Sequence, residues 1–251
     1  MKQSLIIFFS ILCFASCKSE KTFILKEDFN GTNLNESIWN YELGDGCPNL
    51  CGWGNNERQT YTKDNVKVAN GQLIITATKD SSSYYSGRIT TKDKSEFQYG
   101  TIEVRAKLPE GSGLWPAIWM LGNDIDEKTW PACGEIDIME YVGKAPHEIH
   151  TTLHTADSYG QSKNTKVTTI ETIEEGFHVY KCEWNEAAIK FYIDDELVYT
   201  FSPEMKDDKT WPFDKPFYVI LNMAIGGNFG GPEVDDSIFP KEFIVDYVYI
   251  Y

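Results

Sequence analysis

The sequence predicts an all-β fold, an antiparallel β-sandwich of the jelly-roll type. Many short apolar segments are separated by Gly and Pro, helical periodicity is nearly absent, and strands do not alternate with helices. The 251 residues, 41% of them apolar, can bury a full core. Because no repeat, charge block or low-complexity linker divides the chain, we predict a single domain over residues 23–251.

Individual segments carry the strand signals. Polar and apolar residues alternate over residues 98–108, which predicts a half-buried antiparallel strand. Residues 66–78 are centred on an Asn-Gly pair and residues 188–201 turn at an Asp-Asp pair, so each segment predicts a hairpin. A terminal strand is expected over residues 241–251, whereas residues 170–176 can form a turn at most.

The first residues have the pattern of a targeting segment. Lys2 precedes an apolar run over residues 5–14, which is shorter than the roughly 20 residues that span a bilayer. Small residues directly before Cys17 resemble a bacterial lipoprotein cleavage box. We therefore predict a lipoprotein-type signal peptide over residues 1–17 and a short tether over residues 18–22.

Export is expected whether or not the chain is lipidated. A lipidated Cys17 would hold it at the cell surface or outer membrane of a bacterium, with the acyl group as its only membrane anchor. The alternative, a soluble secreted protein, follows from a Phe where the cleavage box usually has Leu. In an oxidising compartment Cys47 and Cys51 can close a short loop disulfide, and two unpaired loop thiols are the alternative.

The charge balance restricts the partners. The chain has 23 Lys and Arg against 38 Asp and Glu, and loss of residues 1–17 removes only Lys2, which changes the net charge from −15 to −16. Such a surface repels nucleic acid and other anionic polymers. We therefore expect no nucleic-acid partner and a neutral substrate, with carbohydrate as the obvious class. We also expect a monomer.

Residues 130–143 carry three carboxylates, Glu135, Asp137 and Glu140, among strand-forming apolar residues. On a regular strand Glu135 and Asp137 share one face, but strict alternation would bury Glu140. An unpaired carboxylate in a core is costly. We therefore predict a β-bulge between Asp137 and Glu140, which resets the alternation and returns all three acids to one surface.

Such a cluster suits glycoside hydrolysis. Two carboxyls roughly 5 to 5.5 Å apart allow one to attack a sugar carbon while the other protonates the leaving oxygen. Like charges that close raise the pKa of the less solvated group, which supplies a protonated acid beside an ionised nucleophile. The alternatives are a solvated edge strand, which the flanking apolar residues disfavour, and a divalent cation site.

The motif Glu-Ile-Asp-Ile-Met-Glu at residues 135–140 resembles the bulged Glu-x-Asp-x-x-Glu signature of glycoside hydrolase family 16. The segments Leu-Trp-Pro-Ala-Ile-Trp at residues 114–119 and Ala-Ile-Gly-Gly-Asn at residues 224–228 resemble its laminarinase branch, the endo-β-1,3-glucanases. The resemblance covers about residues 27–251. It implies a concanavalin-like or lectin-like jelly roll with a concave substrate cleft.

The resemblance also implies an activity. We expect retaining hydrolysis of β-1,3-glucan (laminarin) by double displacement, with no cofactor for catalysis. Glu135 would be the nucleophile, Asp137 the residue that orients it and tunes its pKa, and Glu140 the acid/base. A mixed-linkage β-glucanase, an agarase or porphyranase, and a non-catalytic glucan-binding lectin are the alternatives, because a fold alone does not determine function.

Several aromatic residues are candidates for binding the sugar chain. Trp115 and Trp119 share a strand face, where indole can stack on glucose, and core packing is the alternative for both. Trp130, just before the acids, is expected to form a cleft wall. The segment His-Glu-Ile-His at residues 147–150 lacks the spacing of a helical zinc site. The resemblance points instead to His154, as a cleft residue near the acid/base.

The resemblance places further polar side chains along the cleft. It suggests Asn56 and Glu57 near the donor-side sugars, with Arg88 in the same region, although the first two can instead satisfy loop backbone groups. Asn222 and Asn228 lie on and after a strand that ends in two glycines, so we expect them to reach substrate hydroxyls. A plain bulge explains those glycines equally well.

Asp246 is expected on an apolar face of the terminal strand, because it alternates with Ile244 and Val248. A carboxylate there needs a partner, which can be a cation or an Arg or Lys side chain. The resemblance implies a structural calcium ion on the convex side, bound by Asp246, the backbone carbonyl of Gly71 and Asp28.

Overall fold

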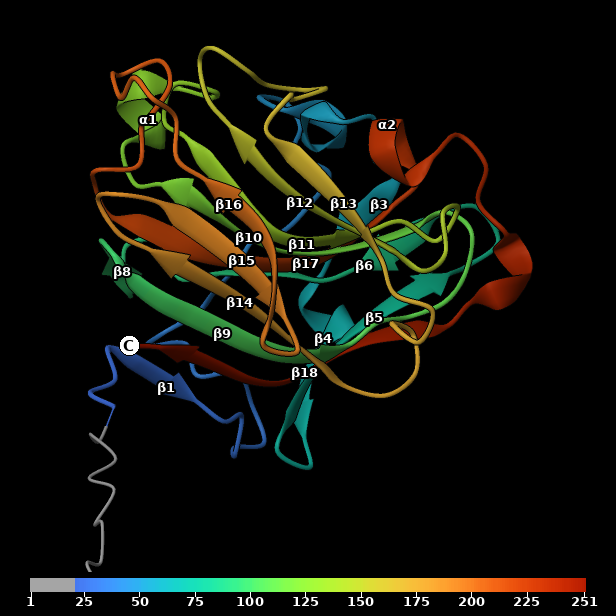
Figure 1. Cartoon of the computed structure of the whole chain (residues 1–251). Helices are drawn as coiled ribbons and strands as arrows, with labels where there is room; N and C mark the ends of the chain where they lie inside the picture. Colours follow the sequence, from blue (N-terminus) through green and yellow to red (C-terminus); the bar gives the residue numbers. More distant parts are fainter. Residues whose placement is uncertain (1–20) are drawn as a thin grey trace, which may run out of the picture.

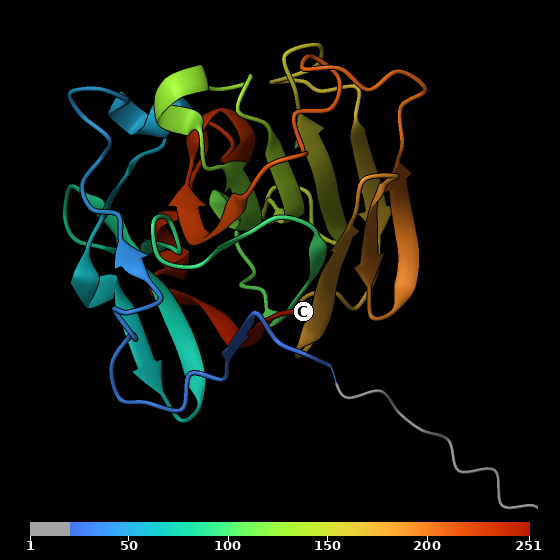
Figure 2. The ribbon, with the colours of Figure 1, turned by 90° about the vertical axis from the view of Figure 1, so that its left-hand side faces the viewer.

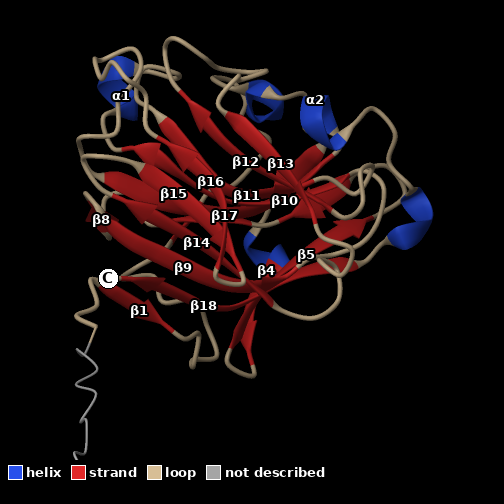
Figure 3. Cartoon of the chain, viewed as in Figure 1, coloured by secondary structure: helices blue, strands red, loops and turns tan. Residues whose placement is uncertain are grey.

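Residues 21–251 are described by the computed structural model, and they form two β-sheets packed face to face (Figures 1 and 3). This confirms the all-β sandwich. The predicted signal peptide, its lipidation site at Cys17 and most of the predicted tether lie outside the described residues. Within the described part of the chain, no helix has the length and apolar character needed to cross a bilayer.

The ten-stranded sheet forms one layer of the sandwich. In spatial order its strands are β16 (Glu196–Phe201), β15 (Ile189–Ile193), β14 (His178–Trp184), β9 (Gly100–Lys107), β18 (Lys241–Ile250), β5 (Gln72–Lys79), β6 (Tyr84–Ser86) and β3 (Gln59–Tyr61), with β1 (Leu25–Glu27) paired to β18 and β4 (Val66–Ala69) paired to β5. All pairs are antiparallel except β3 with β6, which is parallel. In Figures 1 and 2, β1 lies beside the end of β18, where the chain ends.

The eight-stranded sheet forms the other layer. Its strands follow the order β13 (Thr165–Thr169), β12 (Glu148–His154), β11 (Glu135–Tyr141), β10 (Leu114–Gly122), β17 (Phe217–Ile225), β7 (Arg88–Thr90) and β2 (Asn40–Tyr41), with β8 (Glu96–Phe97) paired to β17. Helical structure in residues 21–251 is confined to single turns, which are α1 (Ile125–Lys128), α2 (Gly227–Gly230), η1 (Cys51–Gly54), η2 (Lys63–Asn65) and η3 (Asp236–Ile238).

Both predicted hairpins are confirmed. Strands β4 and β5 turn through Asn70 and Gly71, with φ values of 56° and 73°. Strands β15 and β16 turn through Asp194 and Asp195, with φ values of 49° and 67°. Two successive residues with positive φ produce the tight turn whose twist matches that of paired strands, which is why Asn, Asp and Gly occupy these positions.

The core lies between the sheets and is filled by the inward rows of both. Leu73 and Ile75 of β5 and Ile118 and Met120 of β10 are all fully buried. Burial of each such side chain contributes roughly 1.5–3 kcal/mol, so the inward rows fix which side chains point outward. Cys47 and Cys51 form a disulfide that closes the loop before η1, so the disulfide is present and not the alternative of two unpaired thiols.

The prediction that Asp246 lies on an apolar face is wrong. The pairing of β18 with β9 slips between Val245 and Tyr247, so Asp246 is an extra residue at a bulge. Val245 and Val248 face the core, whereas the Asp246 side chain is 30% exposed on the outer face. Its Oδ2 lies 2.6 Å from Nη1 of Arg105, which is the Arg partner expected as the alternative to a cation.

Candidate active site

The predicted β-bulge is present in β11, between the second and third acids. Trp119 of β10 pairs with Asp137, and the preceding Ile118 pairs with Met139, so Ile138 is the extra residue. The pairing of β11 with β12 slips over the same interval. Ile138 and Met139 are both buried in the core, which is how two successive inward residues reset the alternation.

Deletion of Ile138 should keep the acids on one face, because one inward residue would then separate Asp137 from Glu140. We expect laminarin hydrolysis to survive, while the loss of a buried isoleucine costs roughly 2–5 kcal/mol and lowers Tm by roughly 5–15 °C. Deletion of both Ile138 and Met139 should turn Glu140 toward the core and abolish activity. Rates and Tm of the two deletion variants test this; equal activity in both would contradict the parity argument.

The three acids point outward from the eight-stranded sheet, on the surface that we call the site face. It carries the outward side chains of four central strands, which are Trp115 and Trp119 of β10, Glu135, Asp137 and Glu140 of β11, His150 and His154 of β12, and Asn222 of β17. Asp137 is the deepest acid, only 3% exposed. The sheet thus presents two partly exposed carboxyls with a buried third between them along the strand.

His154 lies beside two of the acids. Its Nε2 is 3.5 Å from Glu135 Oε1 and 3.3 Å from Asp137 Oδ2. Within residues 21–251, Glu135, Asp137 and His154 are the one group of three or more His, Cys, Asp or Glu side chains whose potential metal-ligand atoms all lie within 4.8 Å of one another. An imidazole between two carboxylates can donate an N–H to one of them. His154 thus lies on the site face, but it is opposite Glu135 and not beside Glu140 as expected, because His150 is the histidine that pairs with Glu140.

Burial raises the pKa of every acid in the cluster, and repulsion by neighbouring acids adds to the rise at Glu135 and Glu140. Desolvation, followed by the charges of Asp137 and Glu135, holds the pKa of Glu140 well above its usual range. Desolvation and then the charge of Asp137 raise the pKa of Glu135 to about 8, and burial likewise raises the pKa of Asp137. The cluster is therefore expected to hold a proton near neutral pH, which is what a general acid requires.

Two indoles on β10 hold polar groups of the site face. Trp115 Nε1 donates a hydrogen bond to Glu140 Oε1 at 3.1 Å, and Trp119 Nε1 donates to Asn222 Oδ1 at 2.7 Å. Both side chains are partly exposed and neither belongs to the main core between the sheets. Their placement beside the acids agrees with the sequence-based expectation, and their contact with sugar stays a prediction.

A hydrogen-bonded chain that the sequence did not predict continues from Asn222. Asn222 Nδ2 donates to the Tyr61 hydroxyl at 3.1 Å, which donates to Glu57 Oε2 at 3.1 Å. Gln59 Nε2 also donates to Glu57 Oε2, at 2.6 Å. Glu57 therefore bonds side chains rather than loop backbone groups, and it is linked through Tyr61 to the site face.

Arg88 lies on the same face of the sheet as Asn222, because the two residues pair across β7 and β17. It is only 8% exposed, its guanidinium carbon is 4.4 Å from the Trp53 ring centroid and 5.0 Å from that of Trp119, and its Nε pairs with Glu42. Arg88 thus contacts the indole of Trp119 from within the site face. Glu42 could not be found from the sequence, because it lies in no segment with a recognisable motif.

The remaining predicted binding residues lie at the margins of the site face. Asn56 Nδ2 donates to Asn228 Oδ1 at 2.8 Å, and both residues are exposed. Trp130 is 42% exposed, with its ring centroid 5.7 Å from that of His154. The structure thus joins Asn56 to Asn228 on one side of the acids and places Trp130 against His154.

The residues predicted to bind calcium do not form a cluster of free ligands. Asp246 is paired with Arg105, and Asp28 accepts a hydrogen bond from the Tyr249 hydroxyl. Gly71 lies in the turn between β4 and β5. As placed, these groups do not fit a calcium site without an exchange of partners.

The chain is similar to several carbohydrate-acting proteins. The profile of glycosyl hydrolases family 16 matches residues 54–237. Identity is 40% with the glucan endo-1,3-beta-glucosidase A1 of Niallia circulans, over 91% of this chain and 37% of that protein, so this chain spans just over a third of it. Identity is 41% with a beta-glucanase of Rhodothermus marinus, over 85% of this chain and 78% of that protein.

Comparison with solved structures shows the same similarity. The crystal structure of a laminarinase from Flavobacterium sp. UMI-01 matches with a TM-score of 0.90 at 59% identity, covering 92% of this chain and 100% of that chain. The family profile spans most of the chain and includes the bulged strand with all three acids. The chain belongs to the glycosyl hydrolases of family 16.

Proposed function

We propose that this protein hydrolyses β-1,3-glucan of the laminarin type with retention of anomeric configuration, cutting within the chain. The observation that carries the proposal is the bulged strand β11, which turns three acids with raised pKa values toward one surface, in a chain 59% identical to a laminarinase. Glu135 attacks the anomeric carbon, Glu140 protonates the leaving oxygen and later deprotonates water, and Asp137 with His154 positions Glu135. Family 16 catalysis needs no cofactor.

Initial rates on laminarin, lichenan and agarose test the substrate. We expect the highest kcat/KM on laminarin, with glucan oligosaccharides as early products and the β-anomer appearing first by NMR. A higher rate on lichenan would favour a mixed-linkage glucanase, and a higher rate on agarose would favour an agarase. Binding of laminarin without turnover would contradict the enzyme proposal and favour a glucan-binding lectin.

We propose in addition that the protein is exported, and that Cys17 carries a lipid. The small residues before Cys17 and the apolar run of residues 5–14 support this. Mass spectrometry of the protein made in a bacterium that processes lipoproteins tests it. An acylated chain beginning at Cys17 is expected, and a mature terminus without an acyl group would contradict it.

Calcium binding at Asp28, Gly71 and Asp246 stays a prediction. It can be tested through the ion pair between Arg105 and Asp246. An incoming ion must displace the Arg105 guanidinium from Asp246, so Arg105→Ala should strengthen calcium binding. We expect millimolar CaCl₂ to raise Tm over EDTA-treated protein, and to raise it more in Arg105→Ala. A Tm that calcium leaves unchanged in both proteins would contradict the prediction. EDTA should leave kcat unchanged at a temperature well below Tm.

A further inference from the structure

Two large aromatic side chains lie side by side, exposed, next to the acids. Trp130 is 42% exposed and Tyr159 is 55% exposed, and their rings meet edge to face with centroids 5.5 Å apart. Trp130 in turn contacts His154, whose Nε2 lies 3.5 Å from Glu135. Exposed aromatic rings that touch each other and adjoin a reacting centre are typical of a binding surface.

The aromatic pair, Trp130 and Tyr159, lies on the opposite side of the acids from Asn56 and Glu57. Glu57 forms a bridge with Gly226, at the end of β17, whereas Tyr159 is in the loop between β12 and β13. In the order of the eight-stranded sheet, β11 separates β17 from β12. A glucan chain that crosses the strands at the acids would therefore reach Tyr159 on the β12 side of β11.

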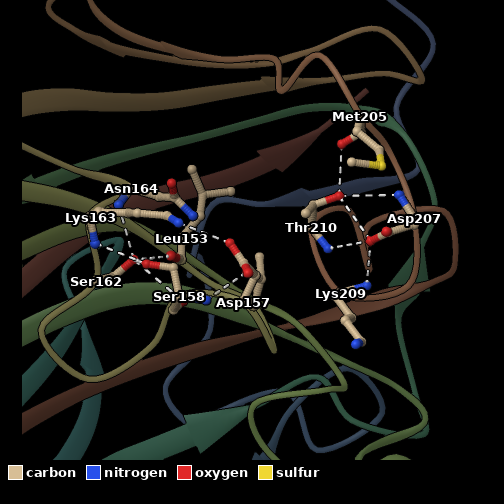
Figure 4. Close-up of polar contacts among 11 residues, drawn as sticks. Leu153, Asp157, Ser158, Ser162, Lys163, Asn164, Met205, Asp207, Lys209 and Thr210 are labelled. Atoms are coloured by element: carbon tan, nitrogen blue, oxygen red, sulfur yellow. Dashed lines mark hydrogen bonds and ion pairs between the residues drawn. The ribbon is translucent and has the colours of Figure 1, made fainter.

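The loop that carries Tyr159 is held by a dense set of hydrogen bonds (Figure 4). The Ser158 hydroxyl accepts from the Lys163 backbone N–H at 2.9 Å and lies 3.0 Å from the Ser162 hydroxyl, which donates to the Leu153 carbonyl at 2.8 Å. Ser158 itself is 7% exposed. A buried polar anchor next to an exposed tyrosine fixes the backbone from which the ring projects.

A second loop braces the first. The Asp157 backbone N–H donates to the Lys209 carbonyl at 3.0 Å, and the Asp157 side chain pairs with Lys163 Nζ at 2.9 Å. The bracing loop is ordered by Asp207, whose Oδ1 accepts from the backbone N–H groups of Lys209 and Thr210 at 2.9 and 3.0 Å (Figure 4). A ring held in place before the ligand arrives loses little conformational entropy on binding.

We propose that Tyr159 and Trp130 form an aromatic subsite that stacks on a glucose unit on the β12 side of the acids. The inference rests on the proposed glucanase function, and it adds Tyr159 as a binding residue. The subsite should matter only for glucan chains long enough to extend past the acids. Tyr159 touches no reacting atom, so its contribution appears in chain-length dependence and not in the chemistry.

Binding to the inactive Glu135→Gln protein, measured by calorimetry, isolates this contribution. Adding Tyr159→Ala should weaken laminarihexaose about 2- to 12-fold, as expected for loss of one aromatic contact, and leave laminaritriose within error. Tyr159→Phe should bind both like the parent, because the ring does the stacking. Tyr192→Ala is the matched control, since Tyr192 points outward from β15 in the other sheet.

Kinetics with Glu135 intact separate failure of this inference from failure of the proposed function. Tyr159→Ala should raise KM for laminarihexaose with little change in kcat, and Tyr159→Phe should restore KM. If the wild type turns over laminarin but Tyr159→Ala matches it at every chain length, the subsite is refuted while the function stands. If the wild type neither binds nor hydrolyses laminarin, the proposed function itself fails.

Discussion

Glu135→Ala should lower kcat on laminarin by at least about 10⁴-fold, because it removes the proposed nucleophile. Glu135 is the acid that faces His154, and it lies on β11 five residues before Glu140. The side chain is partly exposed, so its removal leaves the core intact, and loss of a carboxyl whose pKa the fold raises to about 8 should not lower Tm near neutral pH. Steady-state rates on laminarin and on an aryl β-laminaribioside measure the effect.

Azide distinguishes the role of Glu135 from a general loss of function. With the nucleophile removed, azide can enter the space on that face of the sugar and displace the aryl group once, giving the α-glycosyl azide. Glu140→Ala with azide should instead give the β-glycosyl azide, because the covalent intermediate still forms. Glu242→Ala, exposed on β18 in the other sheet, is the control and should retain activity. A β-azide from Glu135→Ala would reverse the two roles.

The bulge in β11 could be predicted because only one arrangement avoided a buried, unpaired Glu140. The hydrophobic residues on both sides of the acids left no freedom, so the parity argument had a unique answer. The family resemblance then supplied the roles. Fold and acid cluster were therefore accessible from the sequence, together with the two hairpins whose turns need positive φ.

The same reasoning failed at Asp246 because both rows of β18 are apolar. Ile244 and Val248 suggest one inward row, but Val245 and Tyr247 suggest the other equally well, so alternation could not reveal the slip between them. The pattern gives the register only where the two faces differ in polarity.

Long-range hydrogen bonds were also beyond the sequence. The link between Asn222 and Tyr61 joins residues 161 positions apart and depends on the parallel pairing of β3 with β6. Arg88 was expected beside the sugars, whereas the rings of Trp53 and Trp119 pack on its guanidinium and leave it only 8% exposed. Tyr159 had no motif around it, because its position follows from the serine contacts of its loop.

Glu140→Gln should lower activity and raise stability together. Glu140 is the proposed acid/base, so its loss should reduce kcat on laminarin roughly 10²- to 10⁴-fold. The loss should be much smaller for an aryl glycoside whose leaving group needs no protonation. Amide replacement also removes a carboxyl whose pKa the folded protein raises well above its usual value of 4.5.

The sign of the stability change follows from proton linkage. A carboxyl with a raised pKa in the folded state keeps its proton longer there than in the unfolded chain, so unfolding releases protons as pH rises. Stability is therefore highest below the unfolded pKa and is lost as pH rises from about 4.5 toward the folded value, which for Glu135 is about 8.

Glu140→Gln should flatten this decline, both by removing one titrating carboxyl and by relieving its repulsion of Glu135. We expect Tm to rise above that of the wild type at pH 8, and to differ little at pH 4, where all three acids are protonated. Thermal unfolding across this range tests the expectation, with Glu242→Gln, exposed on β18 in the other sheet, as the control. A Tm that falls below that of the wild type at pH 8, with no difference at pH 4, would show that ionised Glu140 stabilises the folded protein, which would remove it as the acid.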